Sequence, residues 1–175
     1  METKLAEALA ALTTGIYVLT VRAGNRQHGM SSSWATQVSG NPILLMVAVD
    51  KEHLTHKMIL ESGTFALNIV GDQNKHLEDY FYSSASRQPD NLVPFALETG
   101  ATGTPLLRDA LASLDCRVVS GHSAGDHTLF IGEVVDARVR GEDRPLTSHD
   151  LPYVYLGGKV LFDQASRRPL ELVKS

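Results

Sequence analysis

The feature that most limits the fold is a series of short segments rich in β-branched and aliphatic residues, punctuated by glycine, asparagine and proline. Such segments predict strands, and their punctuation predicts turns. Helical spacing is confined to short stretches at 3–12, 50–61 and 73–81. A βαβ fold would need regular crossover helices, so the pattern favours a mainly β barrel or sandwich. The expected strands are 15–21, 29–36, 42–49, 65–70, 111–120, 127–140 and 153–162.

The size and composition of the chain fit one domain over 1–175, with a long loop at 82–105 and a polar tail at 166–175. A chain of 175 residues with 43% hydrophobic and 21% charged residues can bury a single core. The longest apolar run, 43–49, is far shorter than the roughly 20 residues of a membrane helix. The first 13 residues lack the basic start and apolar stretch of a signal peptide. We therefore expect a cytoplasmic protein without a membrane partner.

Charge and motif content exclude several other classes. The net charge is −4 and no basic run is present, so nucleic acid is not an expected partner. The chain contains no G-x-G-x-x-G, Walker loop or H-E-x-x-H sequence, which leaves a Rossmann dehydrogenase, a P-loop enzyme and a zincin without support. The single cysteine, Cys116, lies in an apolar strand segment and is predicted to be a buried thiol.

The segment 31–39 is the most informative one, because it carries five hydroxyls within nine residues on a predicted strand and its exit turn. Small hydroxylated residues let a flat ring or a phosphate approach the backbone closely, and they supply hydrogen-bond donors and acceptors. The alternative is an edge strand with a solvated serine face.

The turn 50–56 follows the next strand and leads into a helix. Free amides, Lys51 and the hydroxyl of Thr55 converge there, so an anion would be stabilised. An ordinary capped helix start explains the same residues. A metal bound by His53 and His56 is a weaker alternative, since no third ligand lies near in sequence.

A histidine, His127, stands just inside a predicted strand after Gly125 and Asp126. Its imidazole could donate a hydrogen bond or a proton to a reacting ring, with Asp126 orienting it. A purely structural role is the alternative.

Several segments in register resemble the flavin reductase family of FMN-binding split-barrel proteins, and they cover most of the chain. Val160 departs from the aromatic residue that is usual at its position. The segments that carry the resemblance are 14–20, 29–39 with Pro42, 62–70, 105–107, 114–116, 125–127 and 153–159.

This resemblance implies a fold and a set of site residues. The implied fold is mainly β with short helices, a six-stranded split β-barrel of Greek-key type, assembled as a homodimer. Lys51 and Thr55 would meet the flavin phosphate. Asn68 would lie beside the cleft, where a structural hydrogen-bonding role is equally consistent, and His127 would lie near the stacked nicotinamide. The residues expected to line the flavin ring and its ribityl chain are Ser31, Ser32, Ser33, Trp34, Ala35 and Thr36.

The activity implied is an NAD(P)H-dependent flavin reductase that passes hydride from NADH or NADPH to FMN, with FAD or riboflavin as alternative flavins. It could supply reduced flavin to a flavin-dependent monooxygenase or another acceptor. One alternative is an electron carrier resembling flavoredoxin, which holds FMN and does not oxidise NAD(P)H directly. Another is a flavin or haem storage and sensing module on the same barrel.

Overall fold

The computed structural model describes residues 1–83, 88–158 and 160–171. The helices are α1 (Thr3–Ala10), α2 (Leu54–Ser62) and α3 (His76–Tyr82), with 3-10 turns η1 (Asp72–Asn74) and η3 (Ser148–Asp150). The strands are β1 (Tyr17–Ala23), β2 (Arg26–Ser32), β3 (Ala35–Gly40), β4 (Ile43–Asp50), β5 (Thr64–Ile69), β6 (Leu97–Thr99), β7 (Pro105–Leu107), β8 (Ala112–Ala124), β9 (His127–Val139), β10 (Tyr153–Tyr155), β11 (Val160–Asp163) and β12 (Arg168–Glu171).

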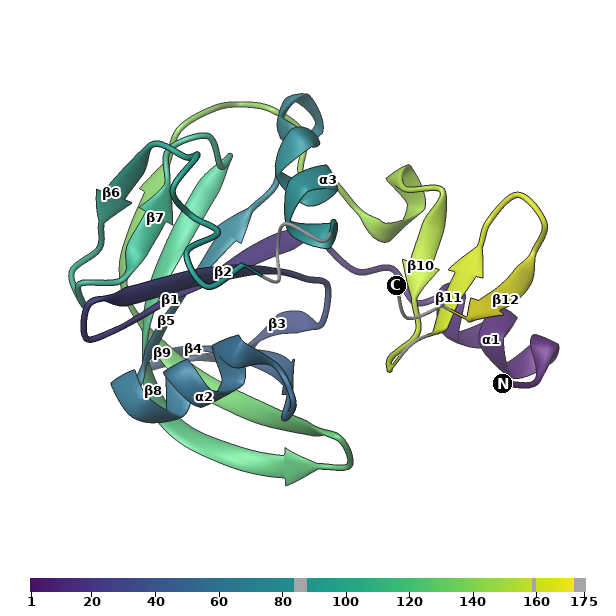
Figure 1. The fold of residues 1–175 in the computed structure, drawn as a ribbon, viewed down its shortest axis with the longest axis horizontal. Coiled ribbons are helices and arrows are strands. Elements are labelled where there is room, and N and C mark those ends of the chain that lie inside the picture. The colour runs from purple at the N-terminus through teal and green to yellow at the C-terminus, as the bar shows by residue number, and fades with distance from the viewer. Residues whose placement is uncertain (84–87, 159, 172–175) are drawn as a thin grey trace.

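Seven strands form the main sheet, in the order β2-β1-β5-β8-β9-β4-β3, and every neighbouring pair is antiparallel. Hairpins join β1 to β2, β3 to β4 and β8 to β9 (Figure 1). The connection from β4 to β5 runs through α2 and passes over two strands of the sheet. Helix α2 ends at Ser62, and its C-cap, Gly63, has a left-handed φ of 68°, which glycine adopts without strain.

The sheet is strongly curled. Its two edge strands, β2 and β3, are consecutive in sequence, and only Ser33 and Trp34 separate them. A link this short spans at most about 11 Å. In a flat sheet, strands at opposite edges of seven would lie about 29 Å apart. The sheet must therefore bend until its edges approach each other, although no ladder between β2 and β3 closes it in the described residues.

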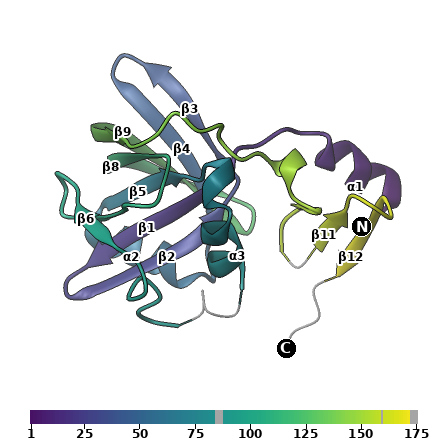
Figure 2. The same ribbon diagram turned by 90° about the horizontal axis from the view of Figure 1, so that it is seen from above.

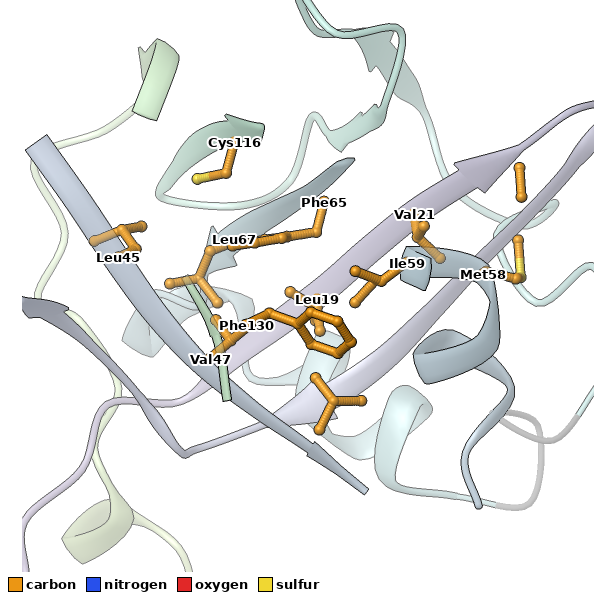
Figure 3. Close-up of a cluster of buried hydrophobic side chains, with 12 residues drawn as sticks. Leu19, Val21, Leu45, Val47, Met58, Ile59, Phe65, Leu67, Cys116 and Phe130 are labelled. Carbon is orange, nitrogen blue, oxygen red and sulfur yellow. The ribbon is translucent and has the colours of Figure 1, made fainter. Parts of the chain in front are cut away.

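The main core fills the inside of this curl. Side chains from β1, β4 and β5 meet those of α2 and of Phe130 on β9 (Figure 3). The predicted thiol, Cys116, is fully buried among them, and burial raises its pKa to about 12, which confirms a structural cysteine. The largest residues of this core are Leu19, Met58, Ile59, Phe65 and Phe130.

A small lobe stands beside the curled sheet, made of α1 and the three-stranded sheet β10-β11-β12 (Figures 1 and 2). The apolar side of α1, with Ala6 and Ala10, packs against Val154, Leu156 and Phe162. A further cluster around α3 lies between this lobe and the main sheet, and it includes residues of both.

Four expectations about strands were wrong. The expected long loop at 82–105 contains β6 and the first residue of β7, which pair with each other. The segment 29–36 was expected to be one strand, but it forms β2 and β3 at opposite edges, which gives seven strands where a six-stranded barrel was expected. The segment 153–162 is divided into β10 and β11 because Gly157 and Gly158 both adopt positive φ. Strand β12 occupies part of the expected polar tail, and 172–175 lie outside the described residues.

The buried side chain of Asn68 forms hydrogen bonds to three other strands, β1, β7 and β8. The amide of Asn68 on β5 donates to the Val18 carbonyl and to Thr20 Oγ1, both at 3.0 Å. Its carbonyl oxygen accepts from the Leu107 amide at 3.0 Å and from Ser113 Oγ at 2.8 Å. All its hydrogen-bonding capacity is thus used within the protein.

We expect Asn68→Ala to lower the free energy of unfolding by about 3 kcal/mol, because it leaves several buried groups unpaired. Urea unfolding measures this. Gln37→Ala is the control: Gln37 is exposed and makes one bond, to the Ser39 carbonyl, so its loss should stay within about 0.5 kcal/mol. Equal losses in both variants would contradict the structural role of Asn68.

Candidate active site

A pocket with a volume of about 250 Å³ lies between the open side of the curled sheet and the small lobe. It is slightly smaller than the about 300–1,000 Å³ of common ligand sites, so it suits a planar ring system better than a whole dinucleotide. Its lining residues are Thr14, Ile16, Met30, Ser31, Ser32, Ser33, Trp34, Ala48, Asp50, His53, Glu78, Phe81, Tyr82, His127, Ser148, Leu151, Tyr153, Val154, Tyr155 and Gly158.

The serine-rich segment forms one wall because of where the sheet is split. Ser31 and Ser32 end β2, and Ser33 and Trp34 cross from one sheet edge to the other. The Trp34 carbonyl accepts from the Ala48 amide at 2.9 Å, which ties the crossing to β4. Residues that would alternate between two faces in one continuous strand are thereby brought together at one pocket.

The pairing of β4 with β9 determines where His127 lies in the pocket wall. In the register of β4 and β9, Asp50 lies opposite His127. The His127 ring lies 4.9 Å from the Trp34 ring, and the Trp34 ring lies 5.5 Å from that of Tyr155. His127 Nδ1 is 2.7 Å from a carboxylate oxygen of Asp126. This bond lowers the pKa of Asp126, so the carboxylate accepts from Nδ1–H and leaves Nε2 for a ligand.

Helix α3 supplies a wall that the sequence analysis did not find. Ser31 Oγ donates to Glu78 at 2.5 Å, and the Tyr153 hydroxyl donates to the other oxygen of Glu78 at 3.2 Å. Only 2% of Glu78 is exposed. Burial raises the pKa of Glu78, and these two hydrogen bonds oppose the shift. Glu78 thus connects β2 of the main sheet to β10 of the small lobe.

Close packing of α3 on β2 depends on a glycine. A Cβ at Gly29 would lie 2.6 Å from the Phe81 ring and 2.9 Å from Leu92. A side chain at this position would push α3 away, and Glu78 could no longer reach Ser31.

Five of the predicted site residues line the pocket and five do not. Ser31, Ser32, Ser33, Trp34 and His127 are brought together there. Ala35 and Thr36 lie on β3, away from the pocket, and Thr36 is exposed.

The predicted phosphate residues, Lys51 and Thr55, do not line the pocket. Lys51 is near the surface, where its ammonium donates to Ser123 Oγ at 2.8 Å and to the Gly125 carbonyl at 2.5 Å. Thr55 is fully buried and bonds to His28 at 2.9 Å. Thr55 and Asn68 therefore have protein partners in place of a ligand, and we do not carry either into the proposed site.

Five further pocket residues were not among the predicted flavin-site residues, although two of them belong to the turn 50–56 and His53 was considered as a metal ligand; they are Asp50, His53, Glu78, Tyr82 and Tyr153. A partial signal was present on α3, because Glu78 and Tyr82 are four residues apart and so share a helix face. No sequence signal placed Tyr153, which comes from the small lobe.

In the part of the chain that the structure describes, no group of three or more histidine, cysteine or acidic side chains could hold a metal. His56 bonds to Thr128 at 2.8 Å, whereas His53 lines the pocket. No helix there is long and apolar enough to cross a membrane.

Comparison with known proteins decides the family. The model of the flavin reductase like domain matches residues 9–160. The chain belongs to the flavin reductase like family. It is 30% identical over 146 residues to a ferric-chelate reductase (NAD(P)H) of Archaeoglobus fulgidus, covering 82% of this chain and 86% of that protein. It is also 30% identical to a putative diflavin flavoprotein of Nostoc, but spans only 24% of that protein's length, against 79% of its own.

Solved structures of flavin reductases share the fold. The styrene monooxygenase flavin reductase of Pseudomonas putida is 31% identical, with a TM-score of 0.70 over 81% of this chain and 89% of that one. The NADH:FAD oxidoreductase of Streptomyces globisporus, solved with NAD and FAD fragments, is 27% identical, with a TM-score of 0.74 over 82% and 86%. Membership in this family supports a flavin-dependent oxidoreductase.

The pocket fits the ring of a flavin. Trp34 and Tyr155 offer flat apolar surfaces, and the serine wall offers hydroxyls close to the backbone. The Tyr82 hydroxyl is buried and has no hydrogen-bond partner within residues 1–83, 88–158 and 160–171, which is what a site completed by a polar ligand would show.

We expect the pH dependence of stability to report on Glu78. Its pKa is raised in the folded state, so its contribution is fully present below its ordinary value of 4.5 and is lost as the pH rises through the raised pKa. The Tm of the wild type should therefore fall relative to that of Glu78→Gln as the pH rises from 4 to 8. A Tm difference independent of pH would contradict a raised pKa.

Proposed function

We propose that the protein is an NAD(P)H-dependent flavin reductase that transfers hydride from NADH or NADPH to FMN, with FAD or riboflavin as alternative substrates. The observation that carries this proposal is the juxtaposition of Ser31–Ser33, Trp34 and His127 in one pocket of a flavin reductase like fold. A bound flavin supplies the redox chemistry, and the protein supplies orientation and electrostatics.

Each wall has a role in this proposal. The serine wall would contact the polar ring atoms and the ribityl chain of a bound flavin, and Trp34 and Tyr155, which line the same pocket, would pack against apolar ring surface. Hydride transfer needs the two rings face to face within about 3–3.5 Å. His127, held by Asp126, orients the nicotinamide at that face. Lys51 would exchange its bonds to Ser123 and Gly125 for the flavin phosphate.

We also propose that the protein is a cytoplasmic homodimer that passes reduced flavin to an oxygenase. One structural neighbour is component B of a nitrilotriacetate monooxygenase, and another is the flavin reductase component of a bacterial two-component tryptophan halogenase. Among the described strands, β3 pairs with β4 alone, and Val38 and Ile43 on this hairpin are about half exposed, which suits burial against a second copy.

An electron carrier is the second candidate. A high molecular weight rubredoxin of Moorella thermoacetica is 30% identical over 149 residues, and this chain spans 64% of it. In such a carrier FMN would stay bound, and electrons would arrive from another protein and not from NAD(P)H.

The test is a visible spectrum of the protein loaded with FMN, before and after addition of NADH or NADPH under anaerobic conditions. A reductase bleaches the flavin absorbance within seconds and oxidises excess NAD(P)H when free flavin is added. Tight FMN with no bleaching by either nucleotide would favour the carrier. No flavin binding at all would reject both functions.

We expect His127→Ala to lower the rate of flavin reduction by NADH about tenfold, which corresponds to one orienting hydrogen bond, while the Kd for FMN changes less than twofold. Stopped-flow absorbance and fluorescence titration measure the two quantities. The control is His122→Ala, which removes an exposed histidine from the same β8–β9 hairpin. Equal rates in wild type and His127→Ala would remove the proposed role of His127.

A further inference from the structure

Two buried side-chain polar atoms lack a hydrogen-bond partner among the described residues, and both belong to the pocket. They are His53 Nδ1 and the hydroxyl oxygen of Tyr82. Buried polar groups in folded proteins are nearly always paired, because an unpaired one loses its hydrogen bonds to water without replacement. Their location in one pocket indicates that a bound molecule completes them.

The Tyr82 hydroxyl stands out by comparison with its neighbour. The rings of Tyr82 and Tyr153 are stacked, with centroids 4.7 Å apart and planes 24° apart. The Tyr153 hydroxyl donates to Glu78, whereas the Tyr82 hydroxyl has no acceptor in the part of the chain that the structure describes. Burial and the nearby Glu78 raise the pKa of Tyr82 to about 12, so the phenol keeps its proton. The Tyr82 hydroxyl is therefore a hydrogen-bond donor that is available to a ligand.

Ser31 supplies the complementary group. Its single hydroxyl proton is directed to Glu78, at 2.5 Å. A serine hydroxyl has one donor and two acceptor lone pairs, so the remaining capacity of Ser31 toward the pocket is that of an acceptor. The hydrogen bond to Glu78 therefore leaves Ser31 as an acceptor toward the pocket. We call Ser31, Glu78, Tyr82 and Tyr153 the α3 wall. This wall offers a donor, the Tyr82 hydroxyl, and an acceptor, the Ser31 hydroxyl oxygen.

The flavin ring has one edge with the matching pattern. Its imide edge presents an N3–H donor between two carbonyl acceptors, whereas the opposite benzenoid edge carries only methyl groups. We propose that the α3 wall recognises this imide edge, with Tyr82 donating to a ring carbonyl and Ser31 accepting from N3–H. The inference rests on the proposed function, because it assigns an orientation to the same ligand in the same pocket.

Binding would pair a group that is unpaired in the free protein. The Tyr82 hydroxyl is enclosed by protein, so a shift of its side chain must accompany entry of the ring. The shift is favoured because it replaces an unpaired buried donor with a paired one. In this assignment Glu78 is a positioning residue, which acts through Ser31 and does not touch the ring.

The test compares three tyrosine-to-phenylalanine variants. In Tyr82→Phe we expect the Kd for riboflavin and for FMN to rise by the same factor, about three- to tenfold, with the Tm unchanged or higher. Tyr153→Phe should instead lower the Tm, because its hydroxyl is already bonded. Tyr80→Phe lies on the same helix outside the pocket and is the control for the substitution itself. Flavin fluorescence quenching and thermal unfolding measure both quantities.

A modified ligand tests the acceptor. N3-methylriboflavin lacks the N3–H donor, so the wild type should bind it at least about threefold more weakly than riboflavin. In Ser31→Ala this preference should disappear. Riboflavin binding that is equally tight in wild type and Tyr82→Phe, or an undiminished preference for riboflavin in Ser31→Ala, would overturn the assignment while leaving the reductase proposal intact. Absence of any flavin binding by the wild type would overturn both.

Discussion

The fold depends on the shortness of one connection between two strands. The two edge strands of a seven-stranded sheet are joined by Ser33 and Trp34 alone, so the sheet has to curl until its edges approach each other. The curl encloses the main core, with α2 packed into it. The same link lies at the split between the edges and carries serine and tryptophan side chains into the pocket. Closure of the core and construction of the site are therefore consequences of one local feature.

The pocket is a place where distant parts of the chain meet. Helix α3 approaches β2 because Gly29 leaves room for the Phe81 ring, and Glu78 then reaches both Ser31 and Tyr153. The β4–β9 register brings His127 opposite Asp50, and the small lobe contributes Tyr155 beside Trp34. Hydroxyl groups, the His127 imidazole and flat aromatic side chains thus surround a space about the size of a planar ring system. This is the arrangement expected of a scaffold that orients a redox cofactor and leaves the chemistry to it.

Some polar side chains in this molecule have hydrogen-bond partners within the protein, whereas others remain available to a ligand. Asn68, Thr55 and Lys51 looked like cofactor contacts in the sequence, yet each has partners within the fold, and for the first two these partners are buried. Tyr82 was expected at the start of the long loop 82–105 and not in the site, yet its hydroxyl is buried and has no hydrogen-bond partner among the described residues. Residue type alone does not distinguish the two groups, because the distinction lies in which neighbours the fold supplies.

The sequence by itself determined the family, the mainly β class, most strand positions, the buried Cys116 and the grouping of the serine segment with His127. The β class, the strand positions and the buried thiol follow from local patterns of hydrophobicity and turns, whereas the family and the grouping of the serine segment with His127 follow from the resemblance of several motifs in register. Only the tertiary structure decided that the serine segment crosses between sheet edges, that β10 and β11 leave the main sheet, and that Glu78, Tyr82 and Tyr153 form a wall of the pocket. The physical reason is that strand order, register and burial depend on contacts between segments far apart in the chain, which no local pattern specifies.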